Sequence, residues 1–159
     1  MNNPVIDLPT LSTVSQAIQL AIAPVFLLAG IGAFLNVCVS RLARIIDRAR
    51  IVEAAVLETG AGAEHDRLVW EVNRLDRRMK VVNAAIFLSV ASAVVVCAVV
   101  CTMFLAVLIE PPLGPVIAIL FILAMLLITG GFATFLHEVR LAAKTIRIRK
   151  EILNHSFED

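Results

Sequence analysis

Three long stretches without a charged residue constrain the fold of this chain more than any other feature. Residues 8–40, 81–109 and 111–137 contain no Asp, Glu, Lys or Arg. A helix needs about 20 mainly apolar residues to cross a hydrocarbon core of about 30 Å, so each stretch is long enough to span a membrane. Hydrophobic residues make up 60% of the 159 residues, and the mean hydropathy is +0.92. The sequence therefore predicts an all-α integral membrane protein with three spans.

The three spans divide the chain into seven segments of a single membrane domain, residues 1–159. We predict an outer tail at 1–13, span one at 14–40, a cytoplasmic helical hairpin at 41–80, span two at 81–109, an outer loop at 110–115, span three at 116–137, and a cytoplasmic helix and tail at 138–159.

The positions of the basic residues predict the orientation. Of the 14 Lys and Arg residues, nine lie within 41–80 and five within 140–150. Connections that stay in the cytoplasm carry the excess of Lys and Arg, so both segments are expected inside. The N-terminus is then outside and the C-terminus is cytoplasmic.

Apolar residues continue at helical spacing beyond the spans. One seam comprises Leu42, Ile45, Ala49, Val52 and Val56, a second Leu68, Val72, Leu75, Met79 and Val82, and a third Leu141, Thr145, Ile148 and Ile152. Steps of three and four residues are typical of helices that pack along one stripe. The first two seams predict a coiled-coil-like antiparallel hairpin around "ETGAGAEHD", with Asp66 as the N-cap of its second arm, and the third predicts a helix packed beside it.

A basic collar is expected where the spans leave the membrane. Its members are Arg41, Arg44, Arg48, Arg50, Arg74, Arg77, Arg78, Lys80, Arg140, Lys144 and Arg147. Such a collar attracts anionic lipid headgroups by about 1 kcal/mol per residue near the surface. A specific anionic ligand or an acidic protein partner is the alternative.

Four polar residues near the collar are candidates for pairing between helices: Asn36, Asp47, Asp76 and Glu138. Polar groups at the membrane edge need a partner, and a partner on another helix would lock the register of the bundle. We expect Glu138 to pair with a collar arginine such as Arg41 or Arg44.

Small residues recur on spans two and three. Ala85, Ser89, Ala93, Cys97 and Cys101 fall at every fourth position, and Gly130 and Thr134 repeat the spacing. Small residues let helices approach closely in lipid. Three interpretations remain open: packing within the chain, a contact between copies, and the lining of a pore.

The residues "NVCVSRLARIIDRAR", "LDRRMKVVNAAI" and "FLHEVRLA" resemble the domain of unknown function 2721 family of small bacterial three-span membrane proteins. The element formed by Arg41, Arg44, Asp47 and Arg48 is the most specific part, and the resemblance extends over roughly 18–147. It implies an integral protein of the bacterial inner membrane and carries over no catalytic residue.

No arrangement of residues in the sequence indicates an enzyme. His137 and Glu138 are not followed by the second histidine of a zinc-protease motif, and there is no nucleophile with a base or glycine-rich phosphate loop. Cys97 and Cys101 share a helix face but lack further metal ligands. We therefore expect no cofactor, metal or nucleic acid. The sequence favours a homo-oligomeric scaffold that interacts with lipid or an unidentified protein partner, with a homo-oligomeric channel-like pore as the alternative.

Overall fold

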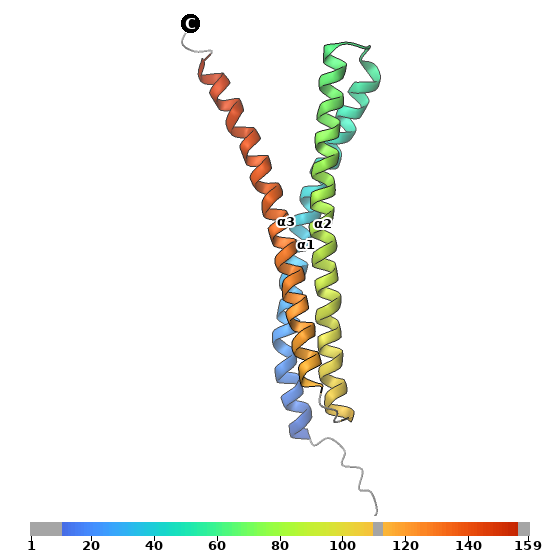
Figure 1. Ribbon diagram of the computed structural model, residues 1–159, viewed down its shortest axis with the longest axis vertical. Helices are drawn as coiled ribbons and strands as arrows, with labels where there is room; N and C mark the ends of the chain where they lie inside the picture. The colour runs from blue at the N-terminus through green and yellow to red at the C-terminus, as the bar shows by residue number, and fades with distance from the viewer. Residues whose placement is uncertain (1–10, 110–112, 156–159) are drawn as a thin grey trace, which may run out of the picture. The chain divides into compact units, whose positions relative to one another are not determined.

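The fold consists of three long helices. The computed structural model describes the backbone of residues 11–109 and 113–155, and the side chains of Ser15, 18–108 and 113–140. The helices are α1 (Leu11–Glu58), α2 (Ala63–Ile109) and α3 (Gly114–His155), shown in Figure 1. No strand occurs within the described residues. The predicted all-α class is confirmed.

Each helix is long and apolar enough to cross a membrane. The candidate spans are Ile18–Glu58, Ala63–Leu108 and Gly114–Arg140. Only 17% of the most apolar window of α1, 28% of that of α2 and 17% of that of α3 is buried within the chain. A soluble protein rarely exposes apolar surface on this scale, so these helices need lipid around them. The chain has the architecture of a multi-pass membrane protein.

One compact unit consists of residues 1–34 and 89–128. Its described residues carry no charge, and its core contains Ala21, Ile31, Val96, Val99 and Ala124. The hydroxyl of Ser92 donates a hydrogen bond of 2.8 Å to the carbonyl of Ala124, which joins α2 to α3. Both residues are fully buried, so the serine hydroxyl is satisfied where no water can reach it.

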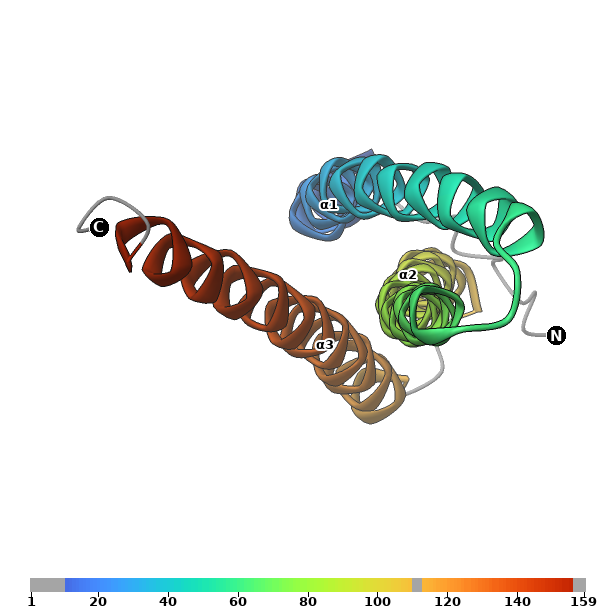
Figure 2. The same cartoon turned by 90° about the horizontal axis from the view of Figure 1, so that it is seen from above.

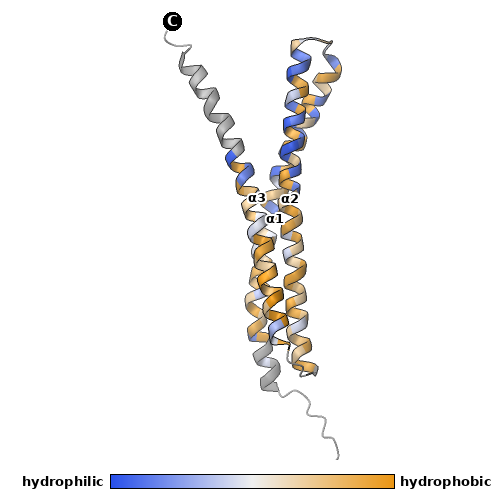
Figure 3. Ribbon diagram, viewed as in Figure 1, coloured by the Kyte–Doolittle hydropathy of each residue, from blue (hydrophilic) through white to orange (hydrophobic). Residues whose placement is uncertain are grey.

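The second unit consists of residues 35–88 and 129–159. Here α1 and α2 form an antiparallel hairpin whose arms lie side by side in both views (Figures 1 and 2). The structure buries Ile45, Ala49 and Val52 of the first predicted seam, and Leu75 and Val82 of the second. The remaining members of both seams are half-buried. Hydrophilic residues are interspersed with apolar ones along both arms (Figure 3).

The hairpin turn differs from the prediction at its second helix. α2 begins at Ala63, and the Asp66 amide donates to the Gly62 carbonyl over 3.1 Å. Asp66 therefore lies in the first turn and is not the N-cap. Ala63 and Glu64 are good helix formers, and acids in the first turn complement the helix dipole, so the helix starts earlier than predicted.

The start of α3 also differs from the predicted loop 110–115. The helix begins at Gly114, and the Ile117 amide donates to the Leu113 carbonyl over 3.1 Å. Pro115 fits the first turn because its missing N–H has no partner there. The third predicted seam, Leu141 to Ile152, lies outside the residues whose side chains are described.

Candidate functional site

Three arginines connect the three helices within the second unit. Arg48 of α1 donates to Glu71 of α2, with its Nη2 2.8 Å from Oε1. Arg78 of α2 donates to Glu138 of α3 over 2.8 Å. The Arg41 Cζ atom lies 5.6 Å from the centroid of the Phe135 ring, within the range of a cation–π contact. Each pair of helices is thus joined by one arginine.

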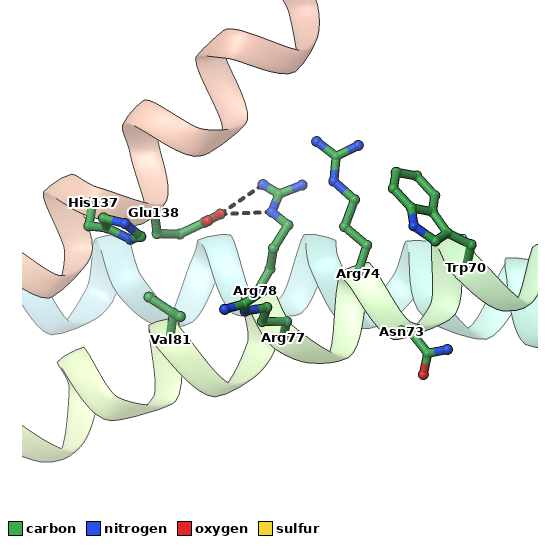
Figure 4. A pocket seen from close by; sticks show the side chains of 8 residues that line it. All are labelled: Trp70, Asn73, Arg74, Arg77, Arg78, Val81, His137 and Glu138. Atoms are coloured by element: carbon green, nitrogen blue, oxygen red, sulfur yellow. Dashed lines mark hydrogen bonds and ion pairs between the residues drawn. The ribbon is translucent and has the colours of Figure 1, made fainter.

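The Arg78–Glu138 pair is the most buried of these contacts. Both Nε and Nη2 of Arg78 donate to Oε1 of Glu138, over 3.0 and 2.8 Å (Figure 4). The Glu138 side chain is only 1% exposed, whereas that of Arg78 is 25% exposed. Glu138 therefore does pair with a collar arginine, but not with Arg41 or Arg44 as predicted. Only the packing of α3 on α2, which brings Glu138 opposite Arg78, could identify the partner.

The other predicted pairing residues do not join helices. Asp76 accepts from Lys80 four residues further along α2, with a Nζ–Oδ2 distance of 2.6 Å. Asn36 and Asp47 are exposed on α1, and neither makes an interhelical hydrogen bond or ion pair with a described residue. They lie away from the face of α1 that buries Cys38 and Ile45. Among the described residues, none of these three side chains joins two helices as expected.

The remaining collar residues line the outside of the second unit. Arg44, Arg50, Arg77, Lys80 and Arg140 are exposed. Arg74 is half-buried, and its Cζ atom lies 5.5 Å from the centroid of the Trp70 ring. The side chains of Lys144 and Arg147 are outside the described part of the chain.

Three grooves of the collar have room for a ligand. One, of about 660 Å³, has the acidic side chain of Glu71 in its lining and is lined by Arg48, Arg67, Trp70, Glu71, Arg74, Leu75 and Arg78. The other two are named after one of their arginines. The first, the Arg74 groove, has a volume of about 540 Å³. In Figure 4 the side chains of Arg74, Arg78 and Trp70 project to the same side of α2, while Asn73 points away. Its lining consists of Trp70, Asn73, Arg74, Arg77, Arg78, Val81, His137 and Glu138.

The second groove, the Arg44 groove, lies between α1 and α2 and has a volume of about 460 Å³. It is lined by Val37, Arg41, Arg44, Ile45, Arg48, Leu75 and Arg78. All three arginines that connect helices therefore line it, together with Arg44. Three of its four arginines belong to the element Arg41, Arg44, Asp47 and Arg48, whereas Asp47 lies outside the groove.

The predicted small-residue stripe divides between the inside and the outside of the chain. Ala85 and Ser89 are fully buried and Ala93 is half-buried, but Cys97 and Cys101 are exposed. A step of four residues rotates about 400° around a helix of 3.6 residues per turn, which is about 40° more than one full turn. Such a stripe therefore winds around α2 and leaves the face that a neighbouring helix covers. Gly130 and Thr134 are half-buried; a Cβ at Gly130 would meet Leu88 at 3.6 Å, an ordinary contact.

Sequence reasoning missed the partners of the collar. Glu71 and Phe135 fix two of its arginines, and Trp70 contacts a third. An acid within a basic segment was the available signal for Glu71, and the only tryptophan of the chain was the signal for Trp70. In the described part of the chain, no three His, Cys, Asp or Glu side chains are grouped so as to hold a metal ion.

These features define a class, the multi-pass helical membrane proteins with an arginine-rich collar next to their spans. The model of the family described as Protein of unknown function (DUF2721) matches residues 21–148. The chain belongs to this family, as its three sequence elements predicted. A search of curated proteins and a search of solved structures each find no match.

Proposed function

We propose that the protein is a non-enzymatic scaffold of the bacterial inner membrane that self-associates and binds anionic lipid headgroups through its collar. In this arrangement the N-terminus is outside, and the hairpin and C-terminus are cytoplasmic. The observation that carries the proposal is the concentration of exposed arginines directly beside segments without charge. Each Lys or Arg residue near an anionic lipid surface contributes about 1 kcal/mol to binding.

The collar keeps positive charge after its internal ion pairs are counted. Arg48, Arg78 and Lys80 have carboxylate partners. Arg41, Arg44, Arg50, Arg77 and Arg140 form no ion pair with a described side chain. These five cations remain available for anions outside the chain, which supports lipid binding over purely internal pairing.

Self-association is supported by one polar side chain on the apolar surface. Asn36 is exposed on α1, five residues before the first arginine of the collar, among the exposed apolar residues Val37 and Val39. A side-chain amide both donates and accepts, so two copies of Asn36 can satisfy each other. Hydrogen bonds of this kind between membrane helices contribute about 0.6 kcal/mol on average.

Native mass spectrometry of the full chain released from nanodiscs tests this proposal. The nanodiscs contain equal amounts of phosphatidylglycerol and phosphatidylcholine. We expect more than one copy per particle and retention of phosphatidylglycerol in preference to phosphatidylcholine. Asn36→Leu should shift particles toward single copies, while Val39→Leu, also exposed on α1, should not. Single copies without a preference for phosphatidylglycerol would contradict the scaffold.

A flux measurement in vesicles distinguishes the scaffold from a pore. Ser89, Ser92 and Val96 are fully buried, so a water path would have to run between copies. Ion or solute flux into vesicles that depends on the protein, and that Asn36→Leu abolishes, would replace the scaffold with a channel-like pore. The scaffold predicts no flux above that of protein-free vesicles.

A further inference from the structure

We infer that the Arg44 groove is a saturable site for one phosphate-bearing headgroup of an anionic lipid, in which Arg41 and Arg44 hold the phosphate. This inference rests on the proposed function and narrows it from a diffuse collar to one groove. The groove brings together four arginines, Arg41, Arg44, Arg48 and Arg78, and no acidic residue lines it.

The groove is organised before any ligand enters it. Arg48 donates a hydrogen bond to Glu71, and Arg78 donates one to Glu138. Arg41 lies over the Phe135 ring. Long side chains lose considerable rotamer entropy when a ligand orders them, and arginines already held by interhelical contacts avoid much of this loss.

Arg44 is the adaptable member of the groove. Its only hydrogen bond to a described residue is a weak one, in which Nε lies 3.4 Å from the carbonyl oxygen of Ser40 one turn earlier. Its side chain is exposed and has no carboxylate partner among the described residues. A guanidinium presents a planar fork that matches two phosphate oxygens, so Arg44 is suited to close over the ligand.

The position of the groove favours a lipid over a soluble phosphate. Val37, an exposed apolar residue of the charge-free stretch, lines one end, and Arg41 is the first charged residue after it. Ile45 and Leu75 supply further apolar lining. A lipid offers both an acyl chain for Val37 and a phosphate for the arginines, whereas inorganic phosphate uses only the arginines.

The Arg74 groove is the weaker candidate for the same ligand. The Glu138 carboxylate is part of its lining. Trp70, which also lines it, precedes Arg77 by about two turns of α2. A fixed carboxylate repels a phosphate in the same groove. The lining of the Arg44 groove contains no carboxylate.

Two single substitutions on α1 form a matched test. Arg44→Gln removes a lining residue, and Arg50→Gln removes an exposed collar arginine that does not line the groove. Both remove one positive charge, and neither residue makes a described contact with another helix. The detergent-purified full chain is titrated with phosphatidylglycerol, and bound lipid is counted by native mass spectrometry.

We expect one saturable phosphatidylglycerol per chain, with at least about tenfold weaker binding in Arg44→Gln, as for the loss of charge-assisted hydrogen bonds to phosphate. Arg50→Gln should stay within about threefold of the unmodified chain. Equal weakening in both variants would overturn the inference that the Arg44 groove is the binding site. It would leave the proposal that the collar binds anionic lipid. Absence of any preference for phosphatidylglycerol over phosphatidylcholine in the unmodified chain would overturn both.

A competition experiment identifies the source of the phosphate. Inorganic phosphate is added at the concentration of phosphatidylglycerol that half-saturates the site. Retention of the lipid supports the lipid site, whereas displacement of half or more would replace it with a site for soluble phosphate. Thermal unfolding of both variants, with midpoints unchanged from the unmodified chain, excludes misfolding as the cause of weaker binding.

Discussion

At the residue scale, Glu138 is the one buried charged side chain in the described part of the chain. It is 1% exposed, and its described ion-pair partner is Arg78. A buried carboxylate loses its hydration, and a well-oriented guanidinium offsets that loss with two hydrogen bonds. The pair therefore stabilises the contact of α2 with α3 only while both members are present.

We predict that Arg78→Leu is far more destabilising than Arg48→Leu. Without Arg78 the Glu138 carboxylate is left buried without its partner, and such losses cost about 3–5 kcal/mol. Glu71 is 32% exposed and Arg48 is 56% exposed, so loss of that pair should cost about 0–1 kcal/mol. Denaturant unfolding of both variants in the same detergent measures the difference.

A companion variant checks the reason for this effect. Replacing both members of the buried pair, as Arg78→Leu with Glu138→Leu, removes the unpaired charge and should recover part of the stability lost in Arg78→Leu alone. No recovery, or equal losses in Arg78→Leu and Arg48→Leu, would show that burial of the Glu138 carboxylate is not the cause.

Residue-scale interactions were only partly predictable. The sequence indicated that an acid in "FLHEVR" pairs with the collar, because a carboxylate beside a span needs a cation. It could not distinguish Arg78 from Arg41 or Arg44, because the choice depends on which turn of α2 faces α3. The same reason explains why Asn36, Asp47 and Asp76 join no helices through described residues: sequence spacing does not say which face of α1 or α2 is covered.

At the element scale, the buried residues of α2 follow alternating steps of three and four. Val82, Ala85, Ser89, Ser92, Val96 and Val99 are all buried. Steps that average 3.5 residues keep a stripe close to one side of a helix of 3.6 residues per turn. The predicted stripe of every fourth residue shares only Ala85 and Ser89 with this buried face.

We predict that leucine destabilises the chain at one position of the predicted stripe and has little effect at another. Ser89→Leu adds a large side chain where the residue is fully buried, and such overpacking costs about 1–3 kcal/mol. Cys97→Leu adds an apolar side chain at an exposed position and should change stability by less than about 0.5 kcal/mol. Unfolding midpoints in detergent compare the two variants. Equal effects would contradict the burial of Ser89 and the exposure of Cys97.

The helices themselves were the most predictable feature of the chain. Long charge-free stretches require backbone groups to bond within the helix, so the three spans follow from composition alone. The hairpin seams could be predicted because apolar residues recur every three or four positions among polar residues. The starts of α2 and α3 were predicted less accurately, because the helix-forming residues Ala63 and Glu64 and the first-turn Pro115 extend both helices into the predicted connections.

At the scale of the whole molecule, the placement of charge decides how the chain enters a membrane. The turn 59–62 connects arms rich in basic residues, whereas the segment before α3 has none. Insertion retains Lys and Arg on the cytoplasmic side, so these two connections are expected on opposite sides of the membrane. One cysteine placed in each connection can therefore test the orientation in intact cells.

We predict that Ala61→Cys is protected from a membrane-impermeant maleimide in intact cells and that Gly114→Cys is labelled. Ala61 lies in the turn 59–62, Gly114 is the first residue of α3, and both are exposed. Accessibility to the reagent should therefore differ only through the membrane. The three native cysteines lie within the charge-free stretches, and the unmodified chain measures their background. Permeabilised cells should label both variants. The reverse pattern would place the collar outside, where the cytoplasmic leaflet's anionic lipids cannot reach it, and would remove the basis for lipid binding on that side.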